Sequence, residues 1–454
     1  MPATDPLLTV EAGRLRFDDV DLVALAEQHE TPFFLFSERR LRANVRGLVD
    51  AFRARHAATE VFFASKACSN RWFLNVVRDE GAGVEVNAGG ELEKALAAGF
   101  EPRRIVFNGV AKTRVEIERA VACGVRALMV DSIYELRRIA EVAAALGRVA
   151  PVAPRIDVHV STLTHPGLET AHGGKAGIDR DDAVAAFRLA ADDPGLEPAG
   201  MHLHVGSQIT SVEPYREAVA AALDIIAAVE AAAGVRLRFL NAGGGFAVPY
   251  REAPVTCHPS DYFCSQLTAA DYAAAIGGEL EARRPDLALF LEPGRSVAAT
   301  TAVVVARVEN EKTKGRRDGA GRRMGDERWL TVDAGFNTLL EHTNYHWYYR
   351  TIVASRAGEE PTAEFRLAGP LCDGGDVFAG DGDSPYRLFP PATTVGDVVA
   401  FLDTGAYALE MMNPYNARPR AAAFAATQDG AVVQIRRRET DADMSAHDAA
   451  PGFD

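Results

Sequence analysis

Cysteine is scarce in this chain of 454 residues, and the few cysteines present are dispersed along it. They are Cys68, Cys123, Cys257, Cys264 and Cys372. Their number is odd, and no pair has the spacing of metal ligands. The pattern therefore predicts neither a metal site nor a disulfide framework, and it is typical of a reducing cytoplasm.

Long apolar runs and positive charge are also in short supply. No apolar run reaches the length of about 18 residues that a membrane span needs, and the first residues lack the basic and apolar regions of a secretory signal. The 49 Lys and Arg residues are outnumbered by 63 Asp and Glu residues, which gives a formal net charge of −14. We therefore expect a cytoplasmic protein that binds neither nucleic acid nor membranes.

The sequence is rich instead in short apolar runs that alternate with Ala-rich amphipathic stretches between residues 33 and 300. VFFASK, VEVNAG, IVFNGV and FLNAGGG are examples of the apolar runs. Continuous rather than alternating apolar character is typical of parallel strands that are covered on both faces by helices. The segment predicts an α/β fold, a (β/α)8 barrel over residues 33–300, with its active site at the C-terminal ends of the strands.

After residue 300 the sequence becomes a series of strand-like runs separated by Gly, Pro and Asp turns. We expect a β-rich domain formed by residues 301–438 together with residues 1–32. Residues 309–326 are so charged and glycine-rich that they predict a surface loop. Residues 439–454 are acidic and predict a flexible tail.

Lys66 directly follows an apolar run in VFFASKACSN. A lysine in this position is either a solvated residue at the end of a strand or an amine held in a dry pocket. Burial would lower its pKa and make it a nucleophile toward an aldehyde. The residue alone does not decide between these interpretations.

Elements that could bind a phosphate follow three later strands. LNAGGGFAVPY contains Gly243, Gly244 and Gly245, which can form a backbone nest for an oxyanion, although tight turns use such glycines too. In LEPGRSVAA, Arg295 can pair with a phosphate or carboxylate, and Glu292 can keep a ring nitrogen protonated. His202 and His204 in HLHVGSQ share one side of a strand, and a buried histidine with satisfied hydrogen bonds is the alternative interpretation.

The C-terminal half adds a loop framed by Gly and Pro, GPLCDGGDVF, that holds Cys372 and Asp373. One interpretation is a turn in which the aspartate caps backbone groups and the cysteine is a small core residue. The other is a thiol acid next to a carboxylate that binds a cationic group of a substrate. Tyr407 and Tyr415 in DTGAYALEMMNPYNARPR could serve packing alone.

Together these segments resemble the fold-type III pyridoxal-phosphate (PLP) decarboxylases, and the diaminopimelate decarboxylases in particular, from about residue 30 to residue 425. The resemblance rests on eight segments in the family's order: FFASKACSN, AGGELEKALAAGF, HLHVGSQI, LNAGGGFAVPY, LEPGR, VDAGFN, GPLCDGGDVF and DTGAY…YNARP. It implies an alanine-racemase-type barrel, pyridoxal 5'-phosphate as cofactor, decarboxylation of an amino-acid substrate, and a homodimer with shared active sites.

The resemblance also implies roles for individual residues. Lys66 would form the Schiff base, His204 would stack on the pyridine ring, and Glu292 would pair with its nitrogen. The other cofactor-binding residues would be Ser207, Gly243, Gly244, Gly245, Gly294, Arg295 and Tyr407. Cys372 would be a catalytic proton donor that comes from the partner subunit. The substrate-binding residues would be Arg295, Glu341, Tyr345, Asp373 and Tyr407.

Four departures from the family pattern concern the substrate pocket. Glu341 stands where the family has an arginine that helps bind the distal carboxylate of diaminopimelate, and His342 replaces a proline. The Cys372-Asp373 pair has a carboxylate one methylene shorter than the usual Glu. In the loop near Lys175, small residues replace a Ser and a ring residue, and Glu85 replaces an Asp.

Reversing the charge at position 341 predicts a decarboxylase for a substrate whose distal end is neutral, cationic or bulky. An authentic meso-diaminopimelate decarboxylase of lysine biosynthesis is the alternative, with Arg295 or another arginine taking over the missing contact. A racemase would place arginine rather than Glu292 at the ring nitrogen. A cofactor-free binding protein would lose Lys66 or the cysteine loop, and this chain keeps both.

Overall fold

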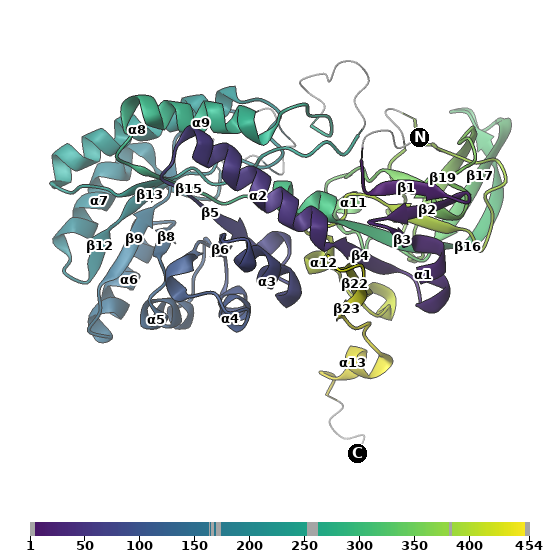
Figure 1. Ribbon diagram of the computed structural model, residues 1–454, viewed down its shortest axis with the longest axis horizontal. Helices are drawn as coiled ribbons and strands as arrows, with labels where there is room; N and C mark the ends of the chain where they lie inside the picture. The colour runs from purple at the N-terminus through teal and green to yellow at the C-terminus, as the bar shows by residue number, and fades with distance from the viewer. Residues whose placement is uncertain are drawn as a thin grey trace. The chain divides into compact units, whose positions relative to one another are not determined.

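The computed structural model describes residues 5–162, 164, 168, 174–251, 262–380 and 384–449. The chain forms two units, which are treated separately: a barrel unit, Leu41–Ala298, and a sheet unit, Met1–Arg40 with Ala299–Asp454 (Figure 1). No helix among the described residues is long and apolar enough to cross a membrane.

The barrel unit is built on parallel strands in the order β12-β9-β8-β7-β6-β5-β15-β14-β13. Their bounds are β5 Thr59–Ala64, β6 Gly83–Val86, β7 Ile105–Phe107, β8 Ala127–Val130, β9 Ala150–Pro154, β12 Leu196–Pro198, β13 Gly200–His202, β14 Phe239–Asn241 and β15 Ala288–Leu291. Strands β12 and β13 are consecutive in the chain and lie at opposite ends of this order. Their segment therefore pairs with β9 on one side and with β14 on the other, and it nearly closes the barrel.

Helices connect the parallel strands, except between β12 and β13, which follow each other directly. They are α2 Glu38–Arg55, α3 Arg71–Asp79, α4 Gly89–Ala97, α5 Arg114–Cys123, α6 Ile133–Ala145, α7 Ala183–Asp192, α8 Glu213–Ala233, α9 Ala269–Arg283 and α10 Arg295–Ala298. Apolar side chains such as Phe62, Val106, Phe239 and Phe290 fill the barrel interior, and the rings of Phe239 and Phe290 stack at 4.1 Å. This apolar layer leaves the C-terminal strand ends for polar residues.

The sheet unit has the strand order β20-β19-β17-β16-β4-β22-β23, to which β21 and β18 are added on β16. The bounds are β4 Phe33–Ser37, β16 Ala302–Arg317, β17 Arg323–Val332, β18 Thr351–Val353, β19 Ala363–Ala368, β20 Arg387–Phe389, β21 Val398–Phe401, β22 Ala422–Ala426 and β23 Val432–Arg436. A small antiparallel sheet, β1 Leu8–Glu11, β2 Arg14–Phe17 and β3 Val20–Asp21, packs with α1 Leu22–Gln28 on the same core.

The structure corrects three expectations about the chain's organisation. Phe33–Ser37 was expected to open the barrel, but it forms β4, which pairs with β16 and β22 of the sheet unit. The predicted loop at 309–326 is instead the paired ends of β16 and β17 around a short turn. Part of the predicted tail forms α13, Asp441–Ser445, because Thr440 and Asp443 make a capping box at its start.

The cysteines differ in part from the expected set of free thiols. Cys68, Cys123 and Cys372 form no disulfide, whereas Cys264 is disulfide-bonded. Cys257 lies outside the described residues. The dispersed spacing of the cysteines did not predict this bond.

Candidate functional site

Glu292 is the centre of a hydrogen-bond cluster at the C-terminal ends of the barrel strands. Asn241 Nδ2 donates to Glu292 Oε1 at 2.6 Å, and Asn108 Nδ2 donates to Oε2 at 3.1 Å. His202 Nε2 lies 3.2 Å from the same Oε2 atom. Burial by itself would raise the pKa of Glu292, but His202, the amide donor and the nearby Lys66 charge outweigh it, so the pKa is lowered. Burial lowers the pKa of His202, which makes it a neutral donor to an ionised Glu292.

Lys66 and Glu85 form a second pair of ionisable groups at these strand ends. Lys66 lies in the turn Ser65–Ala67 directly after β5, and its side chain is exposed in the single chain. Glu85 on the adjacent β6 is fully buried, and neither carboxylate oxygen has a hydrogen-bond partner among the described residues. Burial raises the pKa of Glu85 to about 8; the positive charge of Lys66 opposes that rise, and Glu292 adds to it. Near neutral pH the site therefore holds one ionised and one mostly neutral carboxyl group.

His204 is held against the glycine triplet that follows β14. The backbone N–H of Gly244 donates to His204 Nδ1 at 3.3 Å. Burial lowers the pKa of His204 well below its usual value, and the nearby positive charge of Lys66 adds to the effect. The imidazole is thus a neutral ring with one nitrogen fixed.

The glycine triplet is packed so tightly that no side chain fits. A Cβ on Gly244 would lie 2.2 Å from the carbonyl oxygen of Glu292, and a Cβ on Gly245 would lie 2.0 Å from that of Gly206. Gly243 and Gly245 also have φ values of +68° and +95°. Only glycine therefore lets the loops after neighbouring strands meet in this cradle.

Arg295 and Ser207 complete the predicted barrel residues. Arg295 is buried directly after Gly294, and its Nη1 donates to the hydroxyl of Tyr250 at 3.0 Å. Because this hydrogen bond holds the guanidinium in place, its N–H groups are positioned to donate to a phosphate. Ser207 is half-buried at the end of the HLHVGS segment, next to Gly206, whose carbonyl closes the glycine cradle. The structure thus brings together every barrel residue that the sequence predicted.

Three members of this cluster were missing from the sequence prediction: Asn108, Arg155 and Asn241. Asn108 and Arg155 directly follow β7 and β9, and Asn241 is the last residue of β14. Arg155 is buried; its burial lowers the pKa of its guanidinium, and Asp131 and Glu292 oppose that effect. The signal that could have found them is a polar residue at the C-terminal end of a predicted barrel strand.

In the sheet unit, Glu341 and His342 begin the short helix α11, Glu341–Asn344, and both are buried. The hydroxyl of Tyr349 donates to Glu341 Oε2 at 3.1 Å. The sequence could not show whether Glu341 faces solvent, and the structure places it 2% exposed. Tyr345 follows the helix, and its backbone N–H donates to the carbonyl of Glu341.

Asp376 joins this helix to the Cys372 loop. His342 Nε2 lies 3.3 Å from Asp376 Oδ1, and the same carboxylate accepts the backbone N–H groups of Phe336 and Leu371 at 2.9 Å each. The imidazole also packs on Phe378, with ring centroids 4.2 Å apart. These contacts hold His342, the residue that replaces the family's proline, beneath the Cys372 loop.

Cys372 and Asp373 are exposed at the tip of that loop. The backbone N–H of Cys372 donates to Asn416 Oδ1 at 2.8 Å, and Asp373 Oδ1 accepts from Gly375 N–H at 2.8 Å. Tyr407 is half-buried with φ +65° and directly precedes α12, Ala408–Met411. The loop is therefore positioned by its backbone, while the Cys372 thiol is free.

The loop near Lys175, in which small residues replace a Ser and a ring residue of the family, can be placed only in part. Residues 165–167 and 169–173 lie outside the described residues. Gly177, with φ +102°, donates its N–H to Asp131 Oδ1 at 2.9 Å. Asp131 follows β8, so this part of the loop is tied to the strand ends.

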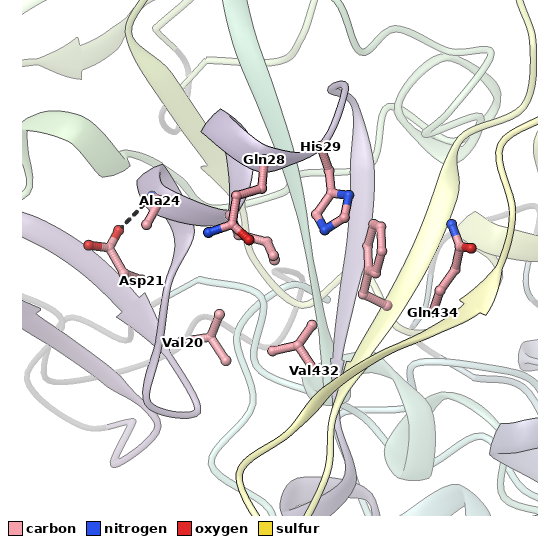
Figure 2. Close-up of a pocket in the computed structure, with 9 residues that line it drawn as sticks. Val20, Asp21, Ala24, Gln28, His29, Val432 and Gln434 are labelled. Carbon is pink, nitrogen blue, oxygen red and sulfur yellow. Dashed lines mark hydrogen bonds between the residues drawn. The ribbon is translucent and has the colours of Figure 1, made fainter.

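The sheet unit also contains a cavity of about 470 Å³ between α1 and β23 (Figure 2). Gln28, His29 and Gln434 line it, and the His29 ring lies 4.3 Å from the Phe424 ring. None of the predicted site residues lines this cavity, so the candidate chemistry does not lie there.

The barrel residues suit pyridoxal 5'-phosphate in three respects. The cradle of Gly243 to Gly245, in which no Cβ fits, lets backbone approach a phosphate, and Arg295 adds a buried positive charge. Glu292 is an ionised carboxylate that can keep a pyridine nitrogen protonated. Lys66 supplies a primary amine near that carboxylate.

Comparison with known proteins identifies the family. The model described as "Pyridoxal-dependent decarboxylase, pyridoxal binding domain" matches residues 42–299, and the one described as "Pyridoxal-dependent decarboxylase, C-terminal sheet domain" matches residues 247–405. The diaminopimelate decarboxylase of Methanothermobacter thermautotrophicus is 34% identical over 96% of this chain and 95% of its own length. That of Pseudomonas aeruginosa is 36% identical over 93% of this chain and 94% of its own length.

Solved structures agree with these matches. The diaminopimelate decarboxylase of Methanocaldococcus jannaschii in complex with L-lysine has a TM-score of 0.86 at 31% identity and covers 98% of both chains. The enzyme of Helicobacter pylori with L-lysine has a TM-score of 0.81 at 31% identity and covers 93% of this chain and 98% of its own. The expected barrel with a second sheet domain, the carboxy-lyase class and the pyridoxal cofactor are thereby confirmed. The chain belongs to the pyridoxal-dependent decarboxylases.

Proposed function

We propose that this enzyme decarboxylates an α-amino acid whose distal end is cationic or neutral rather than a carboxylate. The observation that carries the proposal is Glu341, a buried carboxylate at the position where the resemblance places an arginine. A buried negative charge is costly next to another carboxylate and favours an amine or an uncharged group instead. The hydrogen bond from Tyr349 fixes the Glu341 carboxylate in place.

Arg387, a buried cation near Tyr349, is poorly suited to replace the family's arginine. Its Nη1 donates to the carbonyl of Tyr349 at 2.6 Å and to the hydroxyl of Thr351, and its Nε donates to the carbonyl of Ala379. These bonds engage the Nη1 and Nε groups with two carbonyls and a side-chain hydroxyl. A distal carboxylate would have to compete with them for these two nitrogens, which disfavours its binding there.

The barrel residues have complementary tasks in this reaction. When bound, pyridoxal 5'-phosphate supplies an aldehyde that links to amines and a protonated ring that withdraws electrons from the bond to the leaving carboxylate. Lys66 would supply the primary amine that holds the cofactor. Glu292 would keep the ring nitrogen protonated, and neutral His204 would support the ring without adding a competing positive charge.

The exposed Cys372 and Asp373 support a homodimer in which each loop completes the site of the partner subunit. Asn416 holds the backbone of Cys372, and the N–H of Gly375 holds the carboxylate of Asp373, so the exposed thiol acid and carboxylate are positioned to act on the partner subunit. In this arrangement Cys372 donates a proton to the substrate Cα after carbon dioxide leaves. Asp373 binds the cationic group of the substrate.

The Cys372→Ala variant is expected to lower kcat by about a hundredfold while PLP affinity changes by less than about twofold, because the thiol acts on protons and not on the cofactor's phosphate. Carbon dioxide release and PLP titration by absorbance measure the two effects. Cys123→Ala, on α5, is the matched control and should behave as the unmodified enzyme. Loss of PLP in proportion to the loss of activity would contradict the proton-donor role.

The Glu341→Arg variant is expected to raise the ratio of kcat/KM for meso-diaminopimelate to that for L-lysine by about tenfold or more, because it restores a cation where a distal carboxylate would lie. Glu341→Gln removes the charge at nearly constant size and should give a smaller rise, which protects the test if the arginine variant folds poorly. An unchanged ratio in both variants would mean that Glu341 is only a structural partner of Tyr349.

A further inference from the structure

The paired ends of β16 and β17 form an arm that contributes little to the core of the sheet unit. The register runs from Glu311 opposite Leu330 to Arg317 opposite Arg323. Residues 309–314 of β16 and 323–326 of β17 are exposed, including Met324 at 58%. A two-stranded ribbon of this kind is only marginally stable in water. Because the arm is exposed, packing against the core does not explain why the chain has it.

One side of the arm gathers positive charge around a tryptophan. Lys312, Lys314 and Arg316 alternate along β16 and therefore share one face. The register places Lys312 opposite Trp329 of β17, Lys314 opposite Glu327 of β17, and Trp329 opposite Arg366 of β19. We call Lys312, Lys314, Arg316, Trp329 and Arg366 the basic face.

Three of the four cations of the basic face lie over the ring of Trp329. Lys312 Nζ and Lys314 Nζ lie 5.7 and 5.1 Å from the ring centroid, and the guanidinium carbon of Arg366 lies 4.8 Å from it. The ring itself is fixed because Trp329 Nε1 donates to Glu327 Oε1 at 2.8 Å. Cations that are positioned in advance lose less side-chain entropy when they bind an anion.

The other arginines of the arm are already engaged. Arg322 and Arg323 pair with Asp318 and Asp326 near the turn. Arg328, on the opposite face, donates to the carbonyls of Pro391 and Thr393. Among the described residues, the four cations of the basic face form no ion pair with a carboxylate of this chain.

We propose that the basic face is a docking surface for a partner protein that carries a cluster of carboxylates. The chain has a net charge of −14, so a local group of four unpaired cations steers an acidic patch to this one place. A nucleic acid fits less well, because three of the cations lie over the Trp329 ring on which bases would stack, and the acidic remainder repels a long polyanion. A small, charged surface is typical of a transient complex.

The proposal is tested with the PLP-loaded enzyme, poly-L-glutamate as an acidic polypeptide, and oligo-dT of equal total charge. Tryptophan fluorescence and calorimetry should show salt-sensitive binding of polyglutamate that exceeds binding of oligo-dT. A variant with Lys312→Gln, Lys314→Gln, Arg316→Gln and Arg366→Gln should bind about tenfold or more weakly.

The matched control removes four other cations of the same arm, with Arg317→Gln, Arg322→Gln, Arg323→Gln and Arg328→Gln. It should bind polyglutamate within about twofold of the unmodified enzyme, and both variants should keep full decarboxylase activity. Equal losses in the two variants would reduce the effect to net charge and overturn the proposal. Absence of polyglutamate binding, or tighter binding of oligo-dT, would also overturn it.

Discussion

In the Lys66→Ala variant, decarboxylase activity falls by about three orders of magnitude or more, and the visible absorbance of the protein-bound cofactor disappears. The reason is chemical, because alanine has no amine to link to the cofactor aldehyde. The structure adds an electrostatic consequence. The positive charge of Lys66 lowers the pKa of Glu292, and it opposes the rise that burial causes in the pKa of Glu85. Removing the lysine therefore also raises the pKa of Glu292, the carboxylate that we propose pairs with the ring nitrogen.

Lys66→Arg separates these two effects. It keeps a positive charge near Glu85 and Glu292 but cannot form the covalent link. We expect it to lose the absorbance band and activity as completely as the alanine variant. An active arginine variant would show that only the positive charge of Lys66 is needed, and it would contradict a covalent link between Lys66 and the cofactor.

Glu292→Gln is expected to lower kcat by about two to three orders of magnitude while PLP stays bound, because a neutral amide cannot hold the ring nitrogen protonated. Asn241 and Asn108 both donate to this carboxylate, so an amide NH2 in place of one oxygen also leaves one donor facing another. Steady-state carbon dioxide release gives kcat, and PLP titration gives cofactor affinity.

Glu85→Gln is the matched control for that substitution. Glu85 is equally buried in the same barrel, but its pKa of about 8 leaves it mostly protonated at pH 7. A neutral, nearly isosteric amide should therefore change kcat at pH 7 by less than about threefold. Comparable losses in both variants would mean that general disturbance of the buried cluster, and not the charge of Glu292, controls the rate.

The sequence was informative where chemistry is encoded in short local segments. Lys66, the triplet Gly243 to Gly245 and Glu292 each directly follow a buried strand, and parallel strands bring such residues to one edge. The isolated asparagines Asn108 and Asn241 carry no motif, so only the folded cluster shows that they bind Glu292. Their contribution depends on contacts between distant strands.

Two organisational errors have a common physical cause in long-range pairing. Phe33–Ser37 reads as a first barrel strand, yet its hydrogen bonds are made with β16 and β22, which lie far along the chain. Residues 309–326 read as a loop because charge and glycine dominate them. They form paired strands because the register continues outward from the buried start of β16, and cation–π contacts with Trp329 support the arm.

The sequence suggested the substrate preference from the identity of Glu341, and the structure supports it because Glu341 is buried. Glu341 could have faced solvent, in which case the missing arginine would have had little meaning for specificity. It is instead buried and bonded to Tyr349, beside a helix residue, His342, that contacts Asp376 under the Cys372 loop. The two departures from the family pattern thus lie together in one part of the sheet unit.

Carbon dioxide release by the unmodified, PLP-loaded enzyme tests the central claim most directly. The panel is meso-diaminopimelate, L- and D-lysine, L- and D-ornithine, arginine and 2,4-diaminobutyrate. Our account predicts that a substrate with a cationic distal end is turned over with kcat/KM at least about tenfold above that of meso-diaminopimelate. Preferred turnover of meso-diaminopimelate would contradict this prediction and would show that a cation elsewhere in the enzyme replaces the arginine that is missing at position 341.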